Sequence, residues 1–174
     1  MIKRVRQYVG LLSAVLAYYV IHEGAHLIYA LSASAFRQIN FMGIGIQIGI
    51  YEEQMSNTQL GIFCVVGAVA TMITAYALTL AAPQICKAPS KVFKACMYYI
   101  TMAMLLLDPV YLSILCGFFG GGDMNGIALL IPEWLARAFF GVLLALNGIL
   151  LWKVVLPKYK NAFAERNESN GSKK

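Results

Sequence analysis

The chain has 174 residues, of which 60% are hydrophobic and 13% are charged, and its mean hydropathy is +0.68. These values exclude intrinsic disorder and argue against an ordinary soluble globule. The net charge of +6 does not indicate a nucleic-acid partner. All basic residues except Arg37 and Arg137 flank apolar stretches in alternate connections, as the positive-inside rule describes. We therefore expect an integral membrane protein whose surroundings are the lipid bilayer.

The first apolar stretch, Tyr8–Leu31, follows a basic N-terminal segment and precedes the small residues 32–35. That order is also typical of a secretory signal peptide. However, the stretch exceeds the roughly 20 residues that a membrane span requires. Its second half also contains His22, Glu23 and His26, for which a discarded targeting segment has no use. We interpret it as a first membrane helix.

The next segment, Phe41–Ile50, reads FMGIGIQIGI, and its isoleucines alternate with Gly43, Gly45, Gln47 and Gly49. Strict alternation predicts a β-strand with one branched aliphatic face and one nearly bare face. An open strand edge can pair with an extended peptide through main-chain hydrogen bonds. These four alternating residues are therefore candidate substrate-binding positions. The alternative is that the segment forms a local hairpin, which would cover a functional site without binding substrate.

Three further apolar stretches predict membrane helices over about 58–82, 95–119 and 134–156, and prolines mark the expected ends of the second and last helices at Pro83 and Pro157. The glycines 120–122 predict a broken or re-entrant segment near 119–131. The expected fold is an all-α membrane protein with about four transmembrane helices and a short strand or hairpin after the first.

Residues 1–157 are expected to form a single polytopic membrane domain, followed by a polar cytoplasmic tail over 158–174. Both termini and the basic connection Lys87–Lys94 are expected in the cytoplasm, because basic residues are retained on that side. The protein would then be a multi-pass protein of the cell membrane.

Residues 22–26 read His-Glu-Gly-Ala-His and contain both histidines of the chain. On a helix, positions i and i+4 share a face, so His22 and His26 can reach one metal ion. Glu23 is turned from His22 by about 100°, which places it beside the metal as a candidate general base. Chance HExxH sequences occur on solvated helices, but an ionisable group within a membrane span is costly and commonly functional.

An HExxH motif in the first helix of a small multi-pass protein resembles the site-2 protease family of intramembrane zinc metalloproteases. The resemblance covers roughly residues 8–131: the HExxH helix, the glycine-bearing strand and an aspartate two apolar segments later. It implies one Zn²⁺ held by His22, His26 and an aspartate, with Glu23 as general base, then general acid. The implied substrate is a transmembrane or membrane-proximal protein segment that must unwind before cleavage.

The third metal ligand has two candidates, Asp108 and Asp123. The family's ligand is an aspartate followed by glycine in a helix broken by Asn and Pro, and this chain departs from that pattern at both positions. Helix depth favours Asp108, and we expect Pro109 to break its helix. The glycines before Asp123 permit a sharp re-entry, and Gly126 follows it closely. We therefore predict Asp123 as the ligand, with Asp108 as the alternative or as a neighbour of the site.

Two other functions remain open alongside an intramembrane zinc endopeptidase. A catalytically silent relative would bind membrane segments, although it would have no need for Glu23. A metal-ion carrier would use His22, His26 and the two aspartates, although few polar residues are available to line a path. A homo-oligomer or a partner subunit is compatible with each of these functions.

Overall fold

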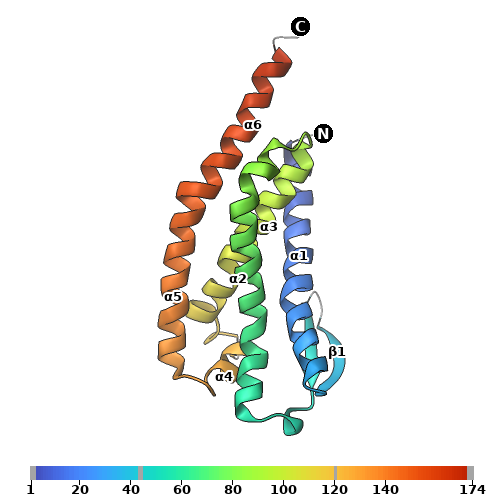
Figure 1. The fold of residues 1–174 in the computed structure, drawn as a ribbon, viewed down its shortest axis with the longest axis vertical. Coiled ribbons are helices and arrows are strands. Elements are labelled where there is room, and N and C mark those ends of the chain that lie inside the picture. Colours follow the sequence, from blue (N-terminus) through green and yellow to red (C-terminus); the bar gives the residue numbers. More distant parts are fainter. Residues whose placement is uncertain (1–2, 43–44, 120, 172–174) are drawn as a thin grey trace.

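In the computed structural model, the chain is described over residues 3–42, 45–119 and 121–171, and it forms a bundle of long helices with a hairpin and a short helix at one end (Figure 1). The helices and strands are α1 (Lys3–Ser32), β1 (Phe36–Met42), β2 (Gly45–Ile50), α2 (Asn57–Lys87), α3 (Lys91–Val110), α4 (Asp123–Ile127), α5 (Glu133–Leu150) and α6 (Leu156–Gly171). A 3-10 turn, η1, covers Glu52–Gln54, and two π-helical turns, η2 (Tyr111–Leu115) and η3 (Leu151–Val155), continue α3 and α5.

Four of the described helical segments are long and apolar enough to cross a membrane, which agrees with the predicted number of transmembrane helices. They are Arg4–Ser32, Asn57–Lys87, Lys91–Leu115 and Glu133–Ala164. Large apolar side chains such as Ile73, Leu80 and Trp152 point outward from these helices. An apolar outer surface is what a bundle surrounded by lipid requires.

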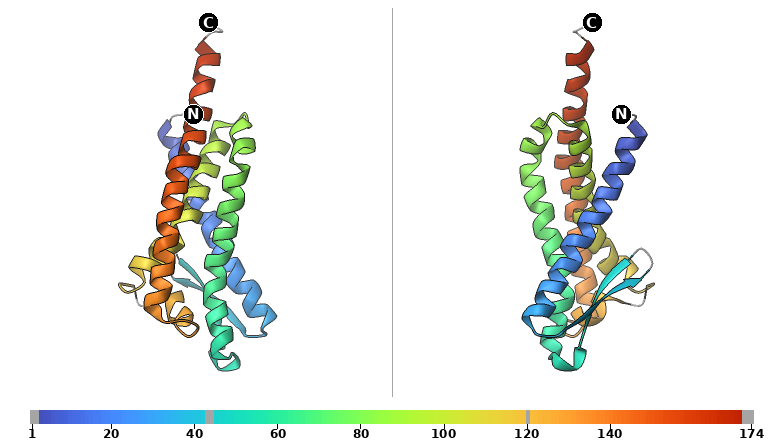
Figure 2. Two further views of the ribbon diagram at one scale, coloured as in Figure 1. Left: turned by 60° about the vertical axis from the view of Figure 1, so that its left-hand side comes forward. Right: turned by 90° about the vertical axis from the view of Figure 1, so that its right-hand side faces the viewer.

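The two ends of the bundle differ in content. The N-terminal end of α1, the connection between α2 and α3, and α6 lie at one end, whereas the hairpin, η1 and α4 lie at the other (Figure 1). In the right-hand view of Figure 2, α1 runs obliquely across the bundle and the hairpin projects from the lower half of the bundle. The connections expected on the cytoplasmic side therefore share one end of the molecule.

The expected helix ends at Pro83 and Pro157 are wrong. Helix α2 continues through Pro83 to Lys87, and the last helical segment continues through η3 and Pro157 into α6. A proline removes one backbone hydrogen bond but does not end a helix that tertiary packing holds on both sides. The π turn just before Pro157 provides the locally shifted hydrogen bonding in which a residue without an N–H is tolerated.

The expected break at Pro109 is also wrong, because α3 passes through Pro109 and extends as η2 to Leu115. Pro109 has no N–H to donate to the carbonyl of Leu105, four residues earlier. The buried side chain of Asn147, on α5, donates to that carbonyl from Nδ2 at 2.8 Å. The Tyr76 hydroxyl donates to Asn147 Oδ1 at 2.9 Å. This tertiary contact satisfies the carbonyl that the proline leaves without a donor.

The strand or hairpin expected after the first helix is a hairpin, in which β1 pairs antiparallel with β2. Phe41 belongs to β1 and pairs with Ile46, while Gly43 lies outside the described residues. Alternation reports which residues share a face and does not reveal a chain reversal. Ile48 is buried with Ala30 and Phe63, and this packing holds the hairpin against α1 and α2.

Candidate metal centre

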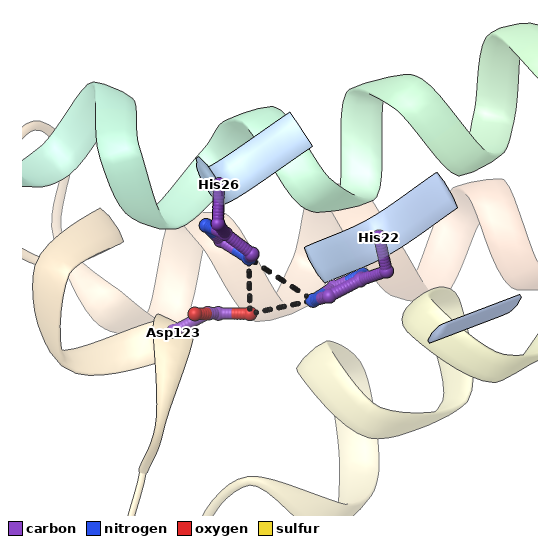
Figure 3. A group of neighbouring side chains, drawn as sticks. All are labelled: His22, His26 and Asp123. Carbon is purple, nitrogen blue, oxygen red and sulfur yellow. Dashed lines mark hydrogen bonds and ion pairs between the residues drawn. The ribbon is translucent and has the colours of Figure 1, made fainter. Parts of the chain in front are cut away.

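The two histidines lie on one face of α1, as their spacing predicts. Their side chains are buried, with His22 6% exposed and His26 3% exposed. Their Nε2 atoms are 3.1 Å apart and point toward the same place (Figure 3). Two ring nitrogens are thus available to a single ion inside the bundle.

Asp123, the first residue of α4, completes a triangle with the two histidines (Figure 3). Its Oδ2 lies 3.2 Å from His22 Nε2 and 3.6 Å from His26 Nε2. The chain turns toward the site at Gly121 and Gly122, which have φ angles of 86° and 44°. Burial raises the pKa of Asp123, but hydrogen bonds with the two histidines outweigh that effect and lower the pKa to about 2. The site therefore presents a carboxylate beside two imidazoles.

The size of this triangle fits a zinc ion. Tetrahedral zinc with ligands at about 2.0–2.1 Å requires neighbouring ligand atoms about 3.3–3.4 Å apart. The three separations in this site are 3.1, 3.2 and 3.6 Å. Two histidines and one carboxylate also form a donor set that catalytic zinc sites use, with a further position left for water or substrate.

Asp108 lies on the opposite side of His22, away from the triangle. Its Oδ1 is 3.2 Å from His22 Nδ1, and its side chain is 1% exposed. The Tyr18 hydroxyl donates to Oδ1 at 2.6 Å, and the Thr71 hydroxyl donates to Oδ2. A carboxylate in this position orients the imidazole and increases its basicity toward a metal. Of the two candidate aspartates, Asp123 is the one beside both Nε2 atoms.

Gly67, on α2, is a site residue that the sequence analysis did not single out. A Cβ at this position would lie 2.5 Å from His26 Nε2 and 2.8 Å from His22 Nε2. Helix α2 can therefore pass behind the histidines only because residue 67 has no side chain. In the sequence, this glycine cannot be distinguished from one that serves ordinary packing of membrane helices.

The triangle borders a cavity of about 260 Å³. Six of the residues expected at the site line it: His22, Glu23, His26, Gln47, Asp108 and Asp123. Five others were not expected there: Tyr18, Ile48, Phe63, Tyr111 and Gly122. Gly45 and Gly49 belong to β2 but do not line the cavity. Glu23 thus shares a cavity with the histidines and Asp123 without belonging to their triangle.

Comparison of the chain with protein-family models, with curated proteins and with solved structures finds no match. The resemblance to site-2 proteases therefore rests on the HExxH motif in an apolar helix, the glycine-bearing strand after it and the later aspartate.

Proposed function

We propose that this protein is an intramembrane zinc endopeptidase of the site-2 protease type. The observation that supports this proposal best is the shared cavity. Glu23 faces the same space as the triangle of His22, His26 and Asp123, and the surrounding helices are apolar enough to cross a membrane. A purely structural pair of histidines would have no need for a carboxylate beside it.

A zinc ion held by this triangle would supply a Lewis acid that makes water more acidic and polarises a peptide carbonyl. Glu23 accepts a proton from the attacking water as the water oxygen bonds to the carbonyl carbon. It then delivers that proton to the amide nitrogen as the C–N bond breaks. The products are a carboxylic acid and an amine, so no further reactant is required.

Three residues around His22 hold its ring in place for this role. Asp108 contacts Nδ1, and the ring of Tyr18 stacks on the imidazole with centroids 5.1 Å apart. Thr71 donates to the far oxygen of Asp108. With Nδ1 facing a carboxylate, Nε2 is the nitrogen available to a metal.

Strand β2 is the proposed holder of the substrate. Neighbouring strand residues point to opposite faces, yet both Gln47 and Ile48 line the cavity, so the cavity borders β2 along an edge. No described residue of β1 lines it, which favours the edge of β2 that does not pair with β1. An unwound membrane segment can add to that edge by main-chain hydrogen bonds. The proposed substrates are membrane-spanning or membrane-proximal peptide segments.

The experiment that tests the function compares wild-type protein with Glu23→Gln in proteoliposomes. The probes are a panel of peptides that each cross the membrane once. Each carries glycine or proline near the end of its span that faces outward, and each is labelled at both termini. Wild-type protein should contain one zinc per chain and cleave members of the panel. Glu23→Gln should keep its zinc and lose cleavage by at least about 100-fold, since general-base catalysis contributes 10²–10⁴-fold.

Glu53→Gln, which removes a carboxylate from an exposed position in η1, is the matched control and should cleave like wild-type protein. Cleavage by Glu23→Gln at the wild-type rate would refute the assigned base. Zinc binding without cleavage of any test segment would favour a silent binder, and zinc flux across the vesicle membrane would favour a carrier.

A further inference from the structure

Tyr111 occupies an unusual place in the fold, at the start of the π turn η2 and two residues after Pro109. It lines the cavity together with Glu23, His22 and Asp123. A π turn changes the direction in which the following side chains point, and such turns are frequent at functional sites. Here it sets an aromatic side chain from α3 and η2 beside groups contributed by α1 and α4.

The hydroxyl of Tyr111 lies against the backbone that carries Asp123. A Cβ at Gly122, the residue before Asp123, would collide with Tyr111 Oη. Gly122 has a φ of 44°, so both the turn and the nearby hydroxyl require glycine there. The Tyr111 hydroxyl is therefore held at the side of the cavity where the metal ligand enters.

This hydroxyl is also available as a donor. Among the residues that the structure describes, none is hydrogen-bonded to Tyr111 Oη, whereas Tyr18, the other tyrosine of the cavity, donates to Asp108 at 2.6 Å. A tyrosine hydroxyl can stabilise the negative charge that develops on a carbonyl oxygen during attack by water. Tyr18 cannot donate to substrate without releasing Asp108.

We propose that Tyr111 is a catalytic residue whose hydroxyl donates a hydrogen bond to the carbonyl oxygen of the scissile peptide. This inference rests on the proposed endopeptidase function. Tyr111 stabilises the charge as it develops, and it neither holds the metal nor transfers the proton assigned to Glu23. Removing one such donor costs about 100- to 1,000-fold in kcat.

The test is Tyr111→Phe, which removes only the hydroxyl, with Tyr98→Phe as the matched control. Tyr98 packs against Tyr99 and Tyr159 and does not line the cavity. Three quantities are measured: zinc content, kcat and KM on a test segment that wild-type protein cleaves, and the affinity of the zinc-loaded protein for acetohydroxamate. The hydroxamate is a small metal-binding anion that needs no substrate sequence.

Tyr111→Phe should keep its zinc and its KM, lose about 100- to 1,000-fold in kcat and bind acetohydroxamate about tenfold more weakly. Tyr98→Phe should match wild-type protein in all three. Equal kcat and equal hydroxamate affinity in Tyr111→Phe and Tyr98→Phe would overturn the inference. Loss of zinc from Tyr111→Phe would also overturn it, because it would show that the Tyr111 hydroxyl supports the structure of the site. If wild-type protein cleaves none of the test segments, the proposed function fails. The affinity for acetohydroxamate then still tests whether the Tyr111 hydroxyl donates a hydrogen bond to an anion bound at the metal.

Discussion

The two nitrogens of His22 face two different carboxylates. Nε2 is 3.2 Å from Asp123, and Nδ1 is 3.2 Å from Asp108. Ionisable groups within a membrane protein are stable only when they are paired or enclosed by protein, and here each carboxylate has partners from other helices. The arrangement assigns different roles to the two aspartates, one beside the prospective metal and one supporting a histidine.

These roles predict different effects on zinc binding. Asp123→Ala should lose stoichiometric zinc, because it removes one side of the triangle. Asp108→Ala should still bind zinc, but about 10- to 100-fold more weakly, since it removes only the group that orients His22. Zinc content and competition with a chelator measure both effects.

Asp108→Asn is the matched control for this comparison, because it retains an oxygen that can accept from Tyr18 or Thr71. Circular dichroism and size-exclusion chromatography establish that each variant is folded. Complete loss of zinc from Asp108→Ala, with zinc retained in Asp123→Ala, would reverse the assignment.

At the scale of elements, the site depends on how α1, α2 and α4 approach one another. Gly67 lets α2 pass close to both Nε2 atoms, and the turn at Gly121 and Gly122 brings α4 to the same place. Strand β2 borders the resulting cavity. Within that strand, Gly49 faces Gln38 and Asn40 of β1, so replacing Gly49 would test the hairpin rather than the proposed substrate edge.

The substrate edge is tested by two substitutions at Ile46. The backbone of Ile48 contacts the Glu23 carboxylate on the side away from β1, and alternate residues of a strand direct their backbone N–H groups to the same edge, so the Ile46 N–H also faces the unpaired edge. Ile46→Ala keeps this N–H, whereas Ile46→Pro removes it. If substrate pairs with this edge, Ile46→Pro should lower kcat/KM about tenfold relative to Ile46→Ala, with zinc content unchanged. Limited proteolysis checks that the hairpin remains intact. Identical turnover in both variants and in wild-type protein would leave β2 a structural role alone.

At the scale of the whole molecule, basic and aromatic side chains join the helices at the end opposite the site. Arg6 and Lys94 lie 5.0 and 5.5 Å from the ring centroid of Phe163. Lys94 Nζ also donates to the carbonyl of Ala162 at 2.7 Å. These contacts connect α1, α3 and α6. From the positive-inside rule we expect this basic end on the cytoplasmic side.

This orientation predicts a labelling pattern for single cysteines introduced into a variant that lacks the four natural ones. In intact cells, a membrane-impermeant maleimide should modify Glu53→Cys, which lies near the hairpin end. It should not modify Pro89→Cys or Lys160→Cys until the membrane is permeabilised. All three positions are exposed, so protection would reflect the membrane rather than burial. Modification of Lys160→Cys from outside would contradict the proposed topology.

The sequence by itself determined the features that depend on neighbouring residues. Hydropathy and the positions of basic residues were enough to predict four membrane helices. The spacing of His22 and His26 was enough to place both rings on one helix face, because helix geometry is local.

The tertiary structure decided the features that depend on distant residues. Asp123 is 101 residues away from His22. The glycines before it favoured Asp123 over Asp108 in the sequence, but only the packing of α4 against α1 places it beside both histidines. The continuation of α3 through Pro109 depends on Asn147 of another helix, and the importance of Gly67 depends on two rings from α1. Each of these outcomes is set by packing between helices, since a local sequence pattern contains no information about which partner a side chain will meet.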